Sequence, residues 1–232
     1  MAIPTVVGVG TAANSTTGNI VPTLPSGWAA DDIHLCVVEQ SAVNAFTTMS
    51  GWTLVTNCQQ KVGSTATDGN IQVFWKRAAG GDTDPTVTGT ANHTSARIIG
   101  IRGCITSGNP WDVTNGGTDA TADTSVVVTG NTTTVADCLV VIFVGTGTDV
   151  ASTTEISGFA NSDLGSVTER MDNWTSDGNG GGFGCATGTK ATTGSYGNTT
   201  ATLVNSANKA YCTIALKPAT STVKQLAALG VG

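Results

Sequence analysis

Short stretches rich in β-branched residues recur along the whole chain, and clusters of Gly, Asn, Asp and Ser separate them. This spacing is typical of β-sandwiches and β-barrels, in which brief strands alternate with turns. Apart from a short candidate at 222–229, no stretch keeps the 3.6-residue apolar period of a capped helix. We therefore expect an all-β protein. The expected strands are Thr5–Val9, Ile33–Glu39, Trp52–Cys58, Asn70–Lys76, Thr86–Thr88, Ala96–Ile101, Thr124–Val128, Leu139–Val144, Val167–Asn173, Gly182–Thr187, Thr200–Val204 and Ala210–Lys217.

The charge of the chain argues against a nucleic-acid partner. Ten Lys and Arg residues stand against sixteen Asp and Glu residues, for a formal net charge of −6. A nucleic-acid surface needs clustered basic side chains, and the ten here are scattered. The N-terminus lacks a basic region followed by a long apolar core, and no apolar run reaches 18 residues. We expect neither a signal peptide nor a membrane span.

The six cysteines are expected to be reduced residues of the core. Three of them, Cys36, Cys138 and Cys212, lie inside apolar strand patterns, where a thiol behaves as a small hydrophobe. No Cys-x-x-Cys pair occurs and the two histidines are far apart, so we expect no zinc site and no cofactor. Asx turns explain the acidic loops at 80–85 and 117–123, although calcium binding there stays open.

An internal repeat indicates that the chain has two similar halves, at about 1–105 and 118–218, followed by a C-terminal arm at 219–232. The repeat aligns Asp32 with Asp137, each ahead of an apolar strand, and Phe74 with Phe183 in a later strand. The halves could form two small sandwiches or one sandwich in which their strands interleave. One jelly-roll-like antiparallel sandwich is favoured, because a shared core is thicker and leaves fewer exposed edges.

Few residues offer catalytic chemistry. His34 lies in an apolar strand and His93 in an expected loop, and there is no Gly-x-Ser-x-Gly elbow to supply a nucleophile. The glutamates Glu39, Glu155 and Glu169 keep glycoside hydrolysis open as an alternative, because that reaction needs only two suitably spaced carboxyl groups. We expect a protein that is not an enzyme.

Five tryptophans are the best candidates for contact with a partner or a sugar. Those at 28, 52 and 75 follow turn or strand patterns and are expected in the core or at its edge. Trp111 and Trp174 occur in polar stretches, and Asn173 precedes the second of them. These three residues are the predicted exposed contacts, with glycan as one possible ligand.

Four motifs resemble those of a set of tailed-bacteriophage virion structural proteins. They are Leu24–Asp32 (Leu-Pro-x-Gly-Trp-Ala-Ala-x-Asp), Ser50–Leu54 (Ser-Gly-Trp-Thr-Leu), Val73–Ala78 (Val-Phe-Trp-Lys-Arg-Ala) and Ala96–Gly103 (Ala-Arg-Ile-Ile-Gly-Ile-Arg-Gly). The resemblance covers mainly residues 1–105 and implies a jelly-roll or Ig-like sandwich in a virion, made in the host bacterial cytoplasm. This chain has Asp31 where the group often has Gly, so it departs from the group at the turn before the strand.

The leading hypothesis from these observations is a capsid decoration or cement protein on the outside of a phage shell. Its partners would be the major capsid protein or other virion proteins, together with further copies of itself, for example in a trimer. The loops and the C-terminal arm would make the contacts, with Lys224, Leu226 and Leu229 as candidate residues of the arm. The alternative is a carbohydrate- or receptor-binding module associated with a tail or fibre.

Overall fold

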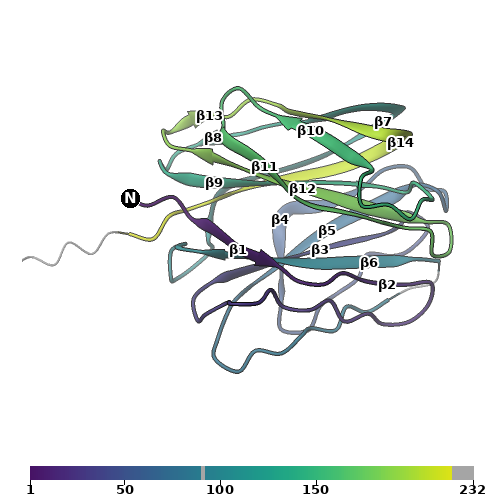
Figure 1. Cartoon of the computed structure of the whole chain (residues 1–232), viewed down its shortest axis with the longest axis horizontal. Helices are drawn as coiled ribbons and strands as arrows, with labels where there is room; N and C mark the ends of the chain where they lie inside the picture. The colour runs from purple at the N-terminus through teal and green to yellow at the C-terminus, as the bar shows by residue number, and fades with distance from the viewer. Residues whose placement is uncertain (90–91, 221–232) are drawn as a thin grey trace, which may run out of the picture.

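The computed structural model describes residues 1–89 and 92–220, and it confirms the all-β class (Figure 1). Fourteen strands and no helix occur in these residues. The same part of the chain accordingly holds no helix of the length and apolarity needed to cross a bilayer. Every predicted strand except Thr86–Thr88 falls at least mainly within an observed strand, and that segment contributes only an isolated bridge between Val87 and Ile20.

The first half of the chain builds one six-stranded antiparallel sheet, called here the first sheet. Its order is β1-β6-β3-β5-β4, and β2 also pairs with β6. The bounds of its strands are Thr5–Val9 (β1), Ala13–Ser15 (β2), Ile33–Ser41 (β3), Thr53–Lys61 (β4), Gly69–Arg77 (β5) and Thr94–Arg102 (β6).

The second half builds the second sheet, in the order β10-β14-β9-β12-β11, and β7 also pairs with β14. A separate pair, β8 with β13, lies beside it. The bounds are Trp111–Val128 (β7), Thr132–Thr133 (β8), Cys138–Thr146 (β9), Ile156–Ala160 (β10), Gly165–Thr175 (β11), Gly181–Lys190 (β12), Gly194–Ser195 (β13) and Thr199–Leu216 (β14).

The two sheets have the same topology, so the expected sandwich of two similar halves is confirmed. The path β1-β6-β3-β5-β4 of the first sheet corresponds to β7-β14-β9-β12-β11 in the second. The expectation that strands of the two halves interleave is wrong, because each half forms one whole sheet. The predicted start of the second half at 118 is also too late, since β7 already begins at Trp111.

Backbone geometry shows that the equivalent of Asp137 is Asp31 rather than Asp32. Asp31 and Asp137 both have left-handed backbones, with φ of 69° and 60°. The amide of each bonds to the carbonyl of an alanine just after the paired strand, Ala78 at 3.0 Å and Ala191 at 3.2 Å. The same turn therefore starts the central strand of each half, and the aspartate tolerates a conformation that most residues avoid.

The corrected alignment also matches the faces of the strands. Ile33 and Leu139, each two residues after the left-handed aspartate, both point into the space between the sheets. The alignment of Phe74 with Phe183 is wrong for the same reason, because Phe74 packs on the outer face of its sheet and Phe183 on the inner face. A one-residue slip exchanges the faces of a strand, so face and register must agree.

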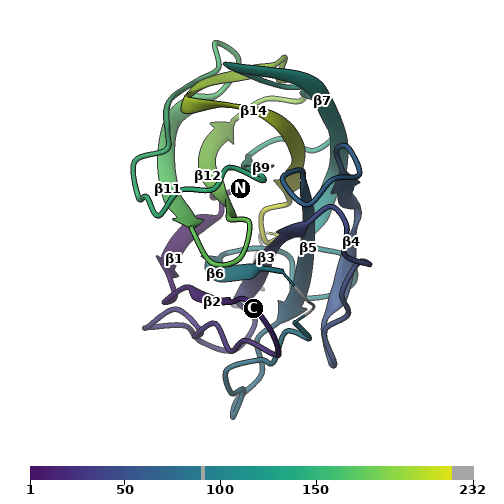
Figure 2. The same ribbon diagram turned by 90° about the vertical axis from the view of Figure 1, so that its right-hand side faces the viewer.

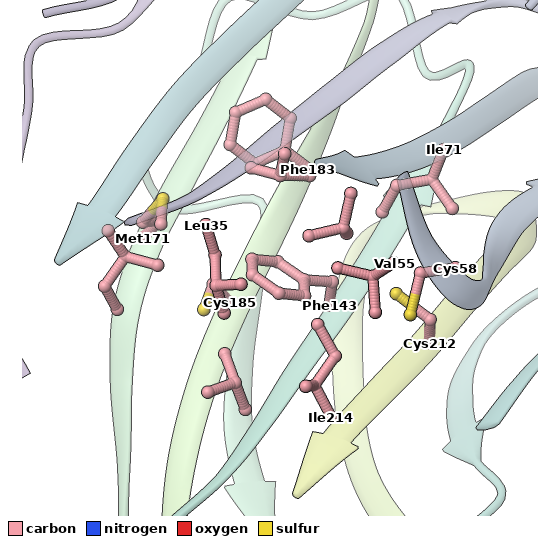
Figure 3. Packing of buried hydrophobic residues seen from close by; sticks show 14 of the residues in the cluster. Leu35, Val55, Cys58, Ile71, Phe143, Met171, Phe183, Cys185, Cys212 and Ile214 are labelled. Atoms are coloured by element: carbon pink, nitrogen blue, oxygen red, sulfur yellow. The ribbon is translucent and has the colours of Figure 1, made fainter. Parts of the chain in front are cut away.

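The main core lies between the two sheets and takes residues from both halves (Figure 3). Leu35 and Ile71 come from the first sheet, while Phe143, Phe183 and Ile214 come from the second, and none of the five is exposed to solvent. A single core of this kind makes the two halves one folding unit, because neither inner face is buried without the other.

Two smaller cores cover the outer faces. Loops of the first half pack Ile20, Met49 and Val87 onto the outer face of the first sheet. On the second sheet, the ends of β7 and β14 curl over the outer face together with β10, and they enclose residues such as Tyr196 and Leu203 (Figures 1 and 2). The central strands β3 and β9 are consequently buried on both faces.

The shared core predicts a large penalty for removing a side chain that reaches across it. Phe143→Ala removes a fully buried ring, so we expect it to lower the free energy of unfolding by about 3–5 kcal/mol. Urea unfolding measures this change. Val204→Ala, at a side chain that is 67% exposed, serves as the control and is expected to change stability by less than about 0.5 kcal/mol. Similar small losses for both variants would contradict a shared core.

Candidate functional site

Trp174 is not an exposed contact residue, so that expectation is wrong. Its side chain is only 4% exposed and belongs to the core on the outer face of the second sheet. The indole Nε1–H donates to the Thr146 hydroxyl at 2.9 Å, which satisfies the one polar atom of the ring. Trp174 lies one residue before the end of β11, so polar residues surround it in the sequence although its ring packs in the core on the outer face.

The other predicted contact residues also serve the scaffold, where the structure describes them. Trp111 is half-buried and packs edge-on against Trp75, with ring centroids 5.5 Å apart. Asn173 donates from Nδ2 to the Ser95 hydroxyl at 2.9 Å and so joins β11 of one sheet to β6 of the other. The arm residues Lys224, Leu226 and Leu229, like the candidate helix at 222–229, lie outside the described residues.

A buried pair of titratable side chains, Glu39 and His93, lies between the sheets at the end opposite the chain termini. Glu39, near the end of β3, and His93, just before β6, are both 0% exposed. The His93 Nε2 atom is 3.1 Å from each carboxylate oxygen of Glu39. The sequence predicted only a loop position for His93, and nothing local in the sequence indicates a partner 54 residues earlier.

The surroundings of the pair raise the pKa of both side chains. Burial raises the pKa of Glu39 to about 7, against the opposing effect of His93. For His93, burial acts to lower the pKa, but attraction to the Glu39 carboxylate and the hydrogen bond to it outweigh burial and raise the pKa above its usual value. Asp149 and Asp177 act in the same direction on His93.

Close packing leaves no room for a substrate beside this pair. A Cβ atom on Gly181 of β12 would lie 2.4 Å from Nε2 of His93 and 2.6 Å from Oε2 of Glu39. The loop before β12 also closes over the pair, because the amide of Asn179 donates to Oδ1 of Asn92 at 2.7 Å. The pair therefore lies at one end of the first sheet, packed against β12 of the second and closed to solvent, although its residue types are those of acid–base catalysis.

A second group of buried carboxylates fixes loops. Both oxygens of Asp172 accept backbone N–H bonds, from Glu155 at 3.2 Å and Ile156 at 3.1 Å. Glu155 in turn accepts from the amide and the side chain of Asn205, at 2.7 and 2.9 Å. Both carboxylates are buried and hold the backbone or side chain of a neighbouring segment, so the geometry favours a structural role for both residues.

The structure also shows the surroundings of the cysteines and of the acidic residues that could bind a metal ion. All six cysteines are buried and free, which confirms the expected core placement, and burial raises the pKa of Cys104 and of Cys138 to about 12. The acidic stretch at 117–123, expected as a loop, lies in β7, and there the ammonium of Lys209 is 3.4 Å from Asp119 and 2.5 Å from Asp123, where a cation would bind. Within residues 1–89 and 92–220, no three His, Cys, Asp or Glu side chains come together as metal ligands.

Two open hollows of about 330 Å³ each lie on the surface of the described chain. One lies between the loops that carry Asp68 and Asp149 and the bend of β14 at Ser206–Asn208. The other lies on the outer side of the first sheet and is lined by Trp52, Lys76 and the loop at 81–86. The second hollow is the one with an aromatic wall, and sequence reasoning missed it because Ser-Gly-Trp at 50–52 was interpreted only as the start of a strand.

Comparisons of the chain with family models, with curated proteins and with solved structures found no match.

The buried pair predicts that stability falls as pH rises. The pKa of Glu39 is raised from 4.5 to about 7 in the folded chain, so the stabilisation from its proton is complete below about pH 4.5 and is lost as pH rises through about 7. The raised pKa of His93 depends on the ionised Glu39 carboxylate and acts in the same direction as pH rises through it. Each proton contributes a slope of up to roughly 1.4 kcal/mol per pH unit. Urea unfolding between about pH 5 and 8 measures the slope.

The double variant Glu39→Gln/His93→Gln is expected to flatten this profile, whatever its stability at one pH, because it removes both titrating groups. Asp163→Asn, at an exposed carboxylate, is the control and should keep the slope. An equally steep profile in the double variant would assign the pH dependence to other groups.

Proposed function

We propose that this chain is a structural protein of a tailed-bacteriophage virion that decorates the outside of the shell. The four motifs that resemble such proteins support this proposal, because they all serve the first sheet. Asp32, for example, accepts a bond from the amide of Ala29 at 2.7 Å and pairs with Arg102 at 2.7 Å. This pairing ties the first motif to the last, so these motifs act as one scaffold.

The observation that carries the proposal is the position of the two terminal segments. Pro4 lies against Gly103, with its Cα 3.7 Å from where a Cβ of that glycine would be, and the amide of Ala219 donates to the Gly103 carbonyl at 2.7 Å. Both segments therefore meet at one pole of the sandwich (Figure 1). A rigid body held at this pole would present its opposite loops outward, as a decoration protein does.

In this proposal the protein works by contact and not by catalysis. Its partners are the major capsid protein or other virion proteins and further copies of the chain, and it is made in the host bacterial cytoplasm before it joins the particle. Cryo-electron microscopy of virions produced by the genome that encodes this chain tests its location. Density on the outside of the shell, with the pole at Gly103 against the capsid, is the expected result. Density confined to the tail would overturn the decoration role and favour receptor binding.

The arm at 219–232 is predicted to strengthen attachment, because it follows the segment at the attached pole. A chain that ends at Pro218 should bind shells lacking this protein about tenfold more weakly than the full chain, measured by co-sedimentation. A full-length chain with Lys224→Gln, Leu226→Ser and Leu229→Ser tests whether the candidate side chains carry the effect, and a chain with residues 221–232 in scrambled order controls for length and composition. Equal binding by the full and shortened chains would contradict a role for the arm.

A further inference from the structure

The hollow at Trp52 is formed by three segments that are distant in sequence. Ser50 and Trp52 come from the turn before β4, Lys76 comes from the end of β5, and the loop at 81–86 closes the opposite side. Left-handed glycines at 51 and 81, with φ of 75° and 89°, make the tight turns on both sides. The hollow thus lies on turns fixed to a sheet, which is a common setting for a binding site.

The ring of Trp52 forms the aromatic wall of the hollow and is supported by other rings packed against it. Trp52 stacks on the ring of His34, with centroids 6.3 Å apart and planes 23° apart. His34 in turn meets Trp28 edge-on at 5.5 Å. His34 is 0% exposed and neither of its ring nitrogens has a hydrogen-bond partner in the described chain, so it serves as a neutral packing residue; burial lowers its pKa. Trp52 is therefore held in one orientation while part of its surface stays open.

Polar groups with remaining hydrogen-bonding capacity surround this ring. The ammonium of Lys76 donates to Oδ1 of Asp82 at 2.6 Å, and an ammonium has three donors. Asp84 accepts from the amide of Leu24 through Oδ1, which leaves Oδ2. Three exposed residues that carry hydroxyls also line the hollow: Ser50, Thr83 and Thr86. None of these three hydroxyls bonds to another residue that the structure describes.

The charges restrict the class of ligand. Lys76 is paired with Asp82, and Asp84 adds a second carboxylate, so phosphate and other anions are disfavoured. A sugar ring fits this arrangement, because it has an apolar face of C–H groups that packs on an aromatic ring and a rim of hydroxyls that both donate and accept. The volume of about 330 Å³ suits a small ligand of roughly one or two sugar rings.

We propose that this hollow binds a neutral saccharide, with the sugar ring on Trp52 and its hydroxyls bonded to Lys76, Asp82 and Asp84. This inference goes beyond the proposed virion role. The site belongs to the folded sandwich, so it is tested with the purified chain and without a particle.

The test is an array of neutral hexose and N-acetylhexosamine oligosaccharides, with sialylated and sulfated oligosaccharides as separate arms. The purified full-length chain is presented in multivalent form, and the strongest hit is titrated by calorimetry. Binding to neutral sugars is expected. No binding on the array, or binding to the acidic arms alone, would overturn the proposal.

Variants locate the binding. Trp52→Leu is expected to weaken the titrated affinity about tenfold or more, because it removes the stacking surface. Lys76→Gln retains a polar side chain and should cost about threefold to tenfold, and it provides a second test if Trp52→Leu does not fold. The matched control is Trp111→Leu, at another half-buried tryptophan, which packs on Trp75 and does not line the hollow. Full affinity in both Trp52→Leu and Lys76→Gln, or an equal loss in Trp111→Leu, would overturn the assignment.

Discussion

Burial of two inner sheet faces against each other is the constraint on which the rest of this structure depends. Leu35 and Ile71 of the first half pack in one buried cluster with Phe143 and Phe183 of the second. Because a sheet with one bare apolar face is unstable in water, the halves must fold as one body. That body encloses the Glu39–His93 pair at one end and brings both terminal segments together at Gly103 at the other.

Strand positions were predictable from the sequence because β-branched runs and turn residues alternate so regularly, but their exact alignment was not. The doublet Asp31–Asp32 offers two alignments with Asp137, and only the left-handed backbone of Asp31 decides between them. The first part of β7, from Trp111 to Asp123, was interpreted as a connection because it is polar and contains a Gly pair. It is nevertheless a strand, since β14 supplies its hydrogen bonds along almost the whole length.

The candidate sites were less predictable, because each depends on contacts between distant segments. The strand phase of Glu39 with Leu35 and Val37 does place it on the inner face, but its partner His93 comes from a loop whose orientation no periodicity sets. Trp174 looked exposed because its neighbours are polar, whereas Trp52 looked structural because it begins a strand. Both predictions used only the residues next to each tryptophan in the sequence. The burial of the two side chains is instead set by distant segments that pack over the outer faces of the sheets.

Differential scanning calorimetry of the intact chain tests the central claim of one shared core most directly. The account predicts a single cooperative transition in which the calorimetric and van't Hoff enthalpies agree, because neither half keeps its inner face buried when the other unfolds. Two separate transitions, each with the enthalpy of about half the chain, would show that the halves fold independently and would contradict the account.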